Sequence, residues 1–170
     1  MIKLLTILPC LLLMFQPLNA KVEKPNYDFS TATLEDFFPG KKIDGIETKY
    51  GKGENIHEIQ GNQTKKFYVA QIRYKFPVMV QAKEGAILDM FARLPSYFLH
   101  DIFFQSLVNK LGKQTSYKKI GEEAVYVWEQ TPLRHVYSAA CTITCFPIFY
   151  SVMPIDKNFN TIMEQMQNKK

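Results

Sequence analysis

The stretch Phe98 to Lys113, with the sequence FLHDIFFQSLVNKLGK, predicts the helix around which the rest of this chain is organised. Large apolar residues recur in it at spacings of three and four, which places them on one face of an α-helix. These residues are Phe103, Phe104, Leu107, Val108 and Leu111. Gly112 is the expected stop signal, because glycine readily adopts the left-handed conformation that ends many helices. We expect the apolar face of this helix to cover a sheet.

An earlier stretch, Phe37 to Lys52, echoes this helix at a shift of 61 positions. The shift aligns Ile46 with Leu107, both of which fall on an apolar helix face. It also aligns Gly51 with Gly112, so both helices would end at a glycine. The first copy is weaker, because it is less apolar and contains an internal glycine.

A second echo relates Ile72–Val80 to Thr142–Tyr150, at a shift of 70 positions. Two echoes in the same order favour a tandem duplication, since self-similarity at a roughly fixed period indicates repeated structural units. The sequence therefore predicts internal repeats at residues 33–94 and 95–153.

The first 20 residues have the pattern of a secretory signal peptide. Lys3 is followed by an apolar run from Leu4 to Phe15, and the small residue Ala20 suits a cleavage site. The run is too short for a membrane anchor, which needs about 20 apolar residues. We expect export to the periplasm or the medium, and a mature single domain at residues 21–170.

Removal of these residues takes away one lysine and no acid, which changes the net charge from +5 to +4. The basic residues are scattered, whereas nucleic-acid-binding proteins usually carry a basic stripe or a recognisable module. The sequence therefore predicts no nucleic-acid partner.

Alternating and periodic segments predict an α+β fold, an antiparallel sheet with helices packed on one face. The clearest strand signal runs from Tyr68 through Phe76 to Ala82, with its even-numbered residues on the apolar face. Other strands are expected at 55–60, 86–94, 115–120 and 124–128, short helices at 33–38 and 41–50, and a C-terminal helix at 156–168.

The stretch Tyr137 to Ile155 contains no charged residue. A transmembrane helix of this length would only just span a bilayer, and Pro147 would interrupt it. β-branched and aromatic residues instead favour two central strands that meet near Pro147. We expect no transmembrane segment in the mature chain.

Cys141 and Cys145 are the two cysteines left after removal of the leader, which favours a disulfide in an oxidising compartment. On one straight strand their Cα atoms would be about 13 Å apart at ~3.3 Å per residue, too far for a bridge. Either the chain turns tightly over Thr142–Thr144 and forms the bridge, or both cysteines are free buried thiols.

No sequence motif indicates catalysis, a cofactor or a metal. The three histidines, His57, His100 and His135, lack the close pairing typical of zinc ligands. We therefore predict no catalytic, cofactor-binding or metal-binding residue, although the sequence does not decide whether the protein is an enzyme.

Aromatic residues are frequent, with thirteen Phe and nine Tyr in the chain. Phe67, Phe91 and Phe149 fall on the strand face opposite the expected core. Aromatic side chains on the second face of a sheet suit a partner or ligand surface, because they supply apolar area with few rotatable bonds. The alternative is that the terminal helix covers this face.

The order of a helix ending in glycine followed by antiparallel strands, with Trp128 in the second copy, resembles the tandem-repeat fold of the β-lactamase inhibitor protein. It is also similar to small outer-membrane assembly lipoproteins built from one such unit. The resemblance implies an exported protein-binding scaffold with a concave sheet. The chain departs from the pattern, because it has no lipidation cysteine and no tryptophan in the first copy. Its two units also do not each carry a disulfide of their own.

The sequence thus favours an exported, non-enzymatic binding or envelope-associated protein that contacts a protein partner through an aromatic sheet face. The alternative is a small-molecule or lipid carrier, with an aromatic pocket between the sheet and the helices.

Overall fold

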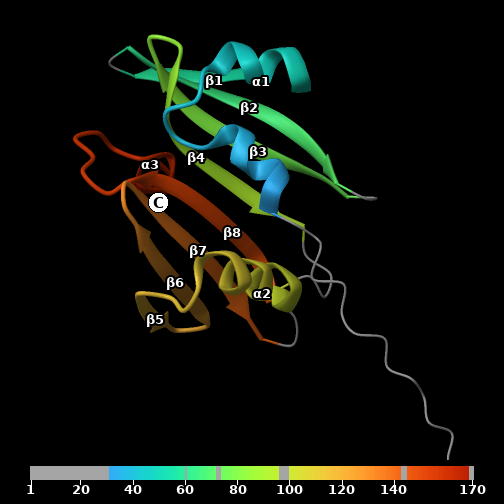
Figure 1. Ribbon diagram of the computed structural model, residues 1–170, viewed down its shortest axis with the longest axis vertical. Helices are drawn as coiled ribbons and strands as arrows, with labels where there is room; N and C mark the ends of the chain where they lie inside the picture. Colours follow the sequence, from blue (N-terminus) through green and yellow to red (C-terminus); the bar gives the residue numbers. More distant parts are fainter. Residues whose placement is uncertain (1–30, 60, 72–73, 96–99, 143–144, 169–170) are drawn as a thin grey trace, which may run out of the picture.

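A single eight-stranded antiparallel sheet forms the body of the molecule, in the order β1-β2-β3-β4-β8-β7-β6-β5. Figure 1 shows it in a computed structural model that describes residues 31–59, 61–71, 74–95, 100–142 and 145–168. The predicted α+β class with an antiparallel sheet is confirmed. The predicted signal peptide lies outside the described residues.

Each half of the sheet is a meander of four strands that follows at least one helix in the sequence (Figure 1). The elements of the first half are the 3₁₀ helix η1 (Thr31–Phe37), α1 (Ile43–Tyr50), β1 (Glu54–Ile59), β2 (Asn62–Gln71), β3 (Tyr74–Lys83) and β4 (Ala86–Leu94). Those of the second half are α2 (His100–Leu111), β5 (Ser116–Ile120), β6 (Glu123–Gln130), β7 (Leu133–Cys141), β8 (Cys145–Pro154) and α3 (Ile162–Gln167).

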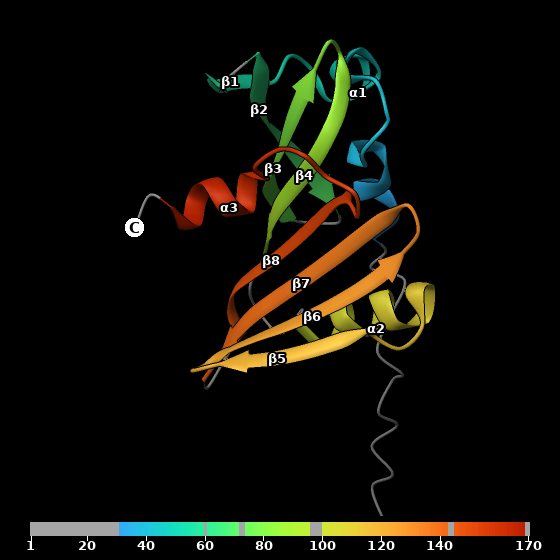
Figure 2. The same cartoon turned by 90° about the vertical axis from the view of Figure 1, so that its left-hand side faces the viewer.

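The helices lie on both faces of the sheet, which corrects the prediction that they pack on one face. Figure 2 shows η1, α1 and α2 on one side of the sheet and α3 on the other. The main core lies on the side of η1, α1 and α2, which we call the helix face. Its buried strand residues include Val78, Ala92, Trp128 and Tyr150. We call the other side the α3 face.

The two halves join where β4 pairs with β8. Met90, Ala92 and Leu94 lie opposite Val152, Tyr150 and Ile148, and all six side chains belong to the core of the helix face. Ser151 Oγ adds a buried hydrogen bond to the Met90 carbonyl at 2.9 Å.

The helix η1 contacts both halves of the molecule. Phe37 packs against Phe67 of β2, while Phe38 meets the ring of His135 on β7. Glu35 forms an ion pair with Lys110 of α2. This short helix therefore ties the two meanders together on the helix face.

The two aligned glycines both end helices, as predicted. Gly51 and Gly112 have φ angles of 82° and 78°, a region in which residues other than glycine are strained. The Gly112 carbonyl accepts a hydrogen bond from the Trp128 indole at 2.8 Å, and the neighbouring Leu111 carbonyl accepts one from Gln130. These bonds satisfy carbonyl groups that a helix end leaves without partners.

The second sequence echo does not join equivalent strands. It relates Ile72–Val80, which contains the start of β3, to Thr142–Tyr150, which contains the start of β8. β3 is the third strand of its meander and β8 is the fourth. This echo therefore gives no support to a duplication, whereas the glycine-terminated helices of the first echo occupy matching places.

Three boundaries differ from the prediction. The run Tyr68–Ala82 is two strands, β2 and β3, which pair with each other from Gln63 opposite Ala82 to Gln71 opposite Tyr74. Pro147 lies inside β8, and the turn between the last two strands comes before Cys145. The C-terminal helix begins only at Ile162, where Thr161 caps it.

Replacement of two glycines should change stability in opposite directions. A Cβ atom at Gly53 would lie 2.6 Å from the ring of Phe67, which is 2% exposed and cannot move outward. We expect Gly53→Ala to lower the free energy of unfolding by about 1–3 kcal/mol through overpacking.

Gly45, which is exposed in α1 with open space around it, serves as the matched control. Gly45→Ala should raise the free energy of unfolding by up to about 1 kcal/mol. Urea unfolding followed by Trp128 fluorescence measures both, and a Gly53→Ala protein as stable as wild type would contradict the packing at this site.

Candidate functional site

Phe67 belongs to the core of the helix face, so its assignment to a binding surface is wrong. It is 2% exposed and lies 5.8 Å from the ring of Phe37. The physical reason is the hairpin between β2 and β3, in which Gln71 pairs with Tyr74. Odd-numbered residues of β2 therefore share a face with even-numbered residues of β3. The sequence pattern predicts one uninterrupted strand here, and in such a strand the same parity would face the core throughout.

Phe91 of β4 and Phe149 of β8 do lie together on the α3 face, with ring centroids 5.2 Å apart. They line a pocket of about 220 Å³ between the sheet and α3. We call it the α3 groove. Its other lining residues are Glu123, Ser138, Met163, Met166 and Gln167.

The α3 groove is mostly apolar and remains accessible. Phe91 is only 4% exposed, because α3 lies over this part of β4. Met166 is 45% exposed and Phe149 is half-buried. α3 therefore covers Phe91, while Phe149 and Met166 remain accessible apolar surface.

Two exposed aromatic residues that sequence reasoning missed extend the apolar surface. Phe146, at the start of β8, is 48% exposed, and its ring lies 5.1 Å from the guanidinium of Arg93. Tyr68 of β2 is 49% exposed, and the ammonium groups of Lys66 and Lys75 lie over its ring. The sequence predicts one strand in place of β2 and β3, which puts Tyr68 on the core face. The hairpin between the two strands reverses this parity, so Tyr68 is exposed.

The capping of α3 fixes its first turn on the α3 face. Thr161 accepts a hydrogen bond from the Glu164 amide, and the Glu164 carboxylate accepts one from the Thr161 amide. Such a reciprocal capping box satisfies two helix-end donors. Glu164 also pairs with Lys157 at 2.8 Å. The segment before α3 and its first turn therefore form one bonded unit.

Asp89 anchors this unit to the sheet. It has no exposed surface, and its Oδ2 accepts a hydrogen bond from the Ile162 amide at 2.8 Å. The Gln81 amide, with its nitrogen turned toward Asp89, donates to Oδ1 at 3.1 Å. Burial is the main reason that the pKa of the Asp89 carboxyl is raised to about 7. The hydrogen bond from the Ile162 amide and the charge of Lys157 lower this pKa, while the charge of Glu164 raises it. A carboxyl group that titrates near neutrality thus lies beneath the helix that forms one wall of the groove.

A second contact holds α3 to the edge of the sheet. His57 Nε2 lies 2.9 Å from Gln165 Oε1 and 3.3 Å from Thr64 Oγ1. His57 therefore links α3 to the edge strands β1 and β2.

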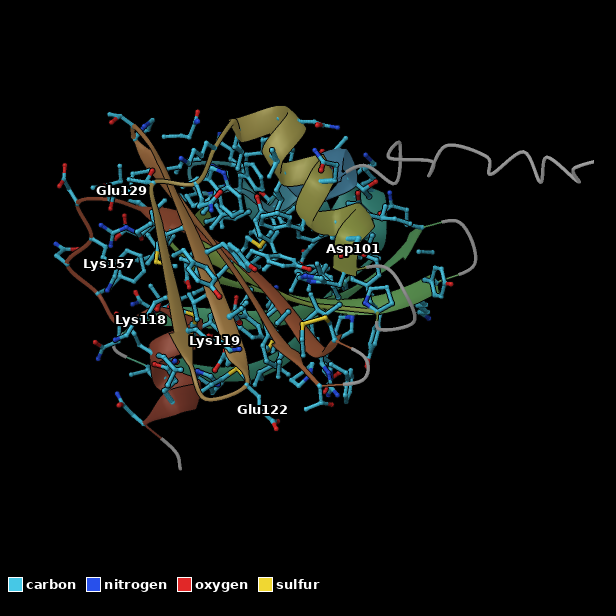
Figure 3. The ribbon with its side chains drawn as sticks, turned by 90° about the horizontal axis from the view of Figure 1, so that it is seen from below. Asp101, Lys118, Lys119, Glu122, Glu129 and Lys157 are labelled. Carbon is cyan, nitrogen blue, oxygen red and sulfur yellow. A yellow bond between two sulfur atoms is a disulfide. The ribbon has the colours of Figure 1, made fainter. Side chains whose placement is uncertain are left out.

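The other two histidines lie on the helix face. Burial lowers the pKa of His135 to about 4, and its Nδ1 is 2.7 Å from the hydroxyl of Tyr150. Burial also lowers the pKa of His100, whose Nδ1 is 2.9 Å from the hydroxyl of Tyr137. Both imidazoles are neutral at neutral pH. Asp101 next to His100 points into solvent, with its side chain 95% exposed (Figure 3).

Most of the aromatic surplus in the second half packs beneath α2 instead of forming a binding face. Phe104 of α2 lies 4.6 Å from the ring of Tyr126 and 6.1 Å from that of Trp128. Tyr126 in turn contacts Tyr117 of the edge strand β5 at 5.0 Å. Offset and edge-on ring pairs at such distances add to the energy of simple burial. The core explains Phe104, Tyr126 and Trp128, whereas Tyr117 at the edge of the sheet stays exposed.

Cys141 and Cys145 form a disulfide, which decides between the two alternatives left open by the sequence. Their Cα atoms are 3.9 Å apart, because the chain turns between them and they lie opposite each other on β7 and β8. Figure 3 shows such bonds in yellow. Among the described residues, this pair and His100 form the group of three His, Cys, Asp or Glu side chains whose potential ligand atoms lie within 4.8 Å of one another.

The described helices are all too short or too polar to cross a bilayer. The uncharged stretch that begins at Tyr137 forms parts of β7 and β8.

Comparison with protein-family models gives no match, and a search of curated proteins gives none either. Among solved structures, the chain is similar to the crystal structure of a DUF4309 family protein (YjgB) from Bacillus subtilis subsp. subtilis, with 7% sequence identity and a TM-score of 0.46. The match covers 75% of this chain and 99% of that chain. A likeness of this degree carries no functional argument, so the site is interpreted from its own residues.

Stability should depend on pH through Asp89. Its pKa is about 7 in the folded chain, while the ordinary value is about 3.9. At pH values between these two pKa values, Asp89 takes up a proton when the chain folds. The free energy of unfolding should therefore fall, on the order of a few kcal/mol, as pH rises from about 4 to 7. Asp89→Asn keeps an acceptor for the Ile162 amide and cannot ionise, so it should remove this slope and be more stable than wild type at pH 8. Urea unfolding across this pH range tests the expectation, and parallel pH profiles for the two proteins would contradict it.

Proposed function

We propose that this protein is an exported, non-enzymatic binding protein that receives an apolar side chain of a protein partner in the α3 groove. The observation that carries the proposal is the pairing of Phe91 with Phe149 beside the accessible methionines of α3. Aromatic residues and methionine are the types enriched at the centres of protein interfaces. Methionine also adapts its shape to different contacts.

The size of the groove favours a protein partner over a free small ligand. Sites for small molecules usually have volumes of about 300–1,000 Å³, and the α3 groove has about 220 Å³. A space of this size suits a single large side chain that a partner inserts, as the energetic anchors of interfaces do. Phe146 and Tyr68 provide further apolar contact area on exposed positions.

Charged groups at the border of this surface would orient the partner. Arg93 lies beside Phe146, and Glu123 lines the groove itself. Lys118, which pairs with Val125 of β6 and is labelled in Figure 3, lies on the exposed edge strand β5. A rim of both signs around an apolar centre is the usual composition of a non-obligate interface.

Export is supported by the leader pattern of residues 1–20 and by the disulfide, because such bonds persist mainly in oxidising compartments. We also propose that the two meanders, at residues 33–94 and 95–153, arose by tandem duplication. The symmetric strand order and the helices that end at Gly51 and Gly112 support this origin.

The second candidate function is a carrier for a small apolar ligand, which the same groove favours because it lies between the sheet and a helix. Its volume would admit only a small ligand or one end of a lipid chain. The two functions differ in what remains bound to the purified protein, since a carrier retains an extractable molecule.

Replacement of Phe149 should weaken partner binding strongly while the fold survives. Phe149 is half-buried, so Phe149→Asp places a charge in the α3 groove without opening the main core. Loss of a central aromatic anchor commonly costs about 2 kcal/mol or more, or roughly thirtyfold in affinity. Tyr117→Asp is the matched control, because Tyr117 is 52% exposed on the helix face. This substitution should leave partner binding unchanged. A photoreactive phenylalanine analogue at position 149 in the native compartment should crosslink a protein that the same analogue at position 117 does not.

Two outcomes would overturn the leading proposal. One is capture of the same proteins from positions 149 and 117, which would mean that the groove is not selective. The other is capture of lipid alone from position 149, which would favour the carrier.

A further inference from the structure

We propose that reduction of the disulfide between Cys141 and Cys145 converts these two residues and His100 into a binding site for Cu(I). One potential ligand atom from each of the three residues lies within 4.8 Å of the others, so they already converge on one point. All three residues are half-buried, which leaves them accessible to a reductant and to an ion.

Tertiary structure brings these ligands together. Cys141 ends β7 and Cys145 begins β8, directly opposite each other in the ladder. His100 is the first residue of α2. The ladder would hold the two thiols near each other after the sulfur–sulfur bond is broken, and α2 would hold the imidazole over them.

Hydrogen bonds of His100 favour one tautomer. The Tyr137 hydroxyl lies 3.4 Å from the His100 carbonyl, to which it donates, so its oxygen can accept a hydrogen bond from Nδ1 at 2.9 Å. This arrangement places the proton on Nδ1 and leaves the lone pair of Nε2 available. Ligating histidines in metal sites usually donate their other ring nitrogen to such a second partner.

Packing fixes the orientation of the imidazole. Its ring stacks on Tyr137 at 5.6 Å and on Phe104 at 6.1 Å. A ligand whose orientation is set by neighbouring rings binds a metal with less loss of freedom.

Two thiolates and one imidazole select for a soft ion. Thiolate ligands favour Cu(I) and Zn²⁺ among the common metals, but structural Zn²⁺ is almost always four-coordinate. The described part of the chain brings three ligands to this point, which suits a metal of lower coordination number. We therefore assign Cu(I).

The chemistry balances with an external dithiol as the reductant. The dithiol gives two electrons and two protons to the disulfide and becomes a disulfide itself, leaving two protein thiols. Each thiol then loses its proton as its sulfur binds the ion, and copper enters and remains as Cu(I).

Competition with a chromophoric Cu(I) chelator under anaerobic conditions tests the site, after a dithiol reductant has been used and removed. All proteins carry Cys10→Ser, so that the cysteine pair contains the only thiols. Reduced wild type should bind one Cu(I) per chain, and the oxidised form should bind none. Cys141→Ser/Cys145→Ser should abolish binding, and His100→Gln should weaken it by at least about tenfold.

Two further variants separate a built site from chance binding. Tyr137→Phe removes the hydroxyl partner of His100 and should weaken Cu(I) binding by roughly tenfold or more. His57→Gln is the matched control, because His57 lies beside Gln165 at α3, and it should leave binding unchanged.

Equal affinity of wild type and His100→Gln would overturn the proposal. So would a reduced protein that has lost its circular dichroism signal, because the fold would then not build the site. Retention of Zn²⁺ in preference to Cu(I) would overturn the choice of ion.

Discussion

The antiparallel pairing of β4 with β8 is the interaction on which the rest of the structure depends. A four-stranded meander has one apolar face that must be covered, and neither half of this chain has enough helix to form a large core alone. The pairing places Ala92 directly opposite Tyr150 and makes the two apolar faces continuous. Because of this continuity, Phe37 at the end of η1 can contact Phe67 in one half, and the next residue, Phe38, can contact His135 in the other.

The same seam builds the α3 groove. Phe91 comes from β4 and Phe149 from β8, so their contact on the α3 face exists only because these strands are neighbours. The chain after β8 then folds back across this face, where Asp89 binds the first turn of α3. The helix face is filled by aromatic side chains, whereas the α3 face is only partly covered. A partner would therefore find accessible apolar surface on the α3 face.

Some features of the site follow from sequence alone and others do not. The sequence limited Cys141 and Cys145 to a disulfide or two free buried thiols, and the structure shows the disulfide. Phe91 and Phe149 were identified by parity, which holds because no turn interrupts β4 or the part of β8 after Pro147. Phe67 and Tyr68 were exchanged between core and surface, because an unrecognised hairpin reverses the parity of all residues that precede it. No sequence signal pointed to Asp89 as an anchor, since its partners are distant in the chain.

The sequence by itself determined much of the local structure: helices ending at Gly51 and Gly112, and alternating strands. These features depend on neighbouring residues, whose spacing is fixed by the geometry of helix and strand. Only the tertiary structure decided which strands adjoin, on which face α3 lies, and that His100 stands beside Cys141 and Cys145. Such contacts join residues far apart in the chain. Their formation depends on how all apolar faces are buried together, which no local pattern specifies.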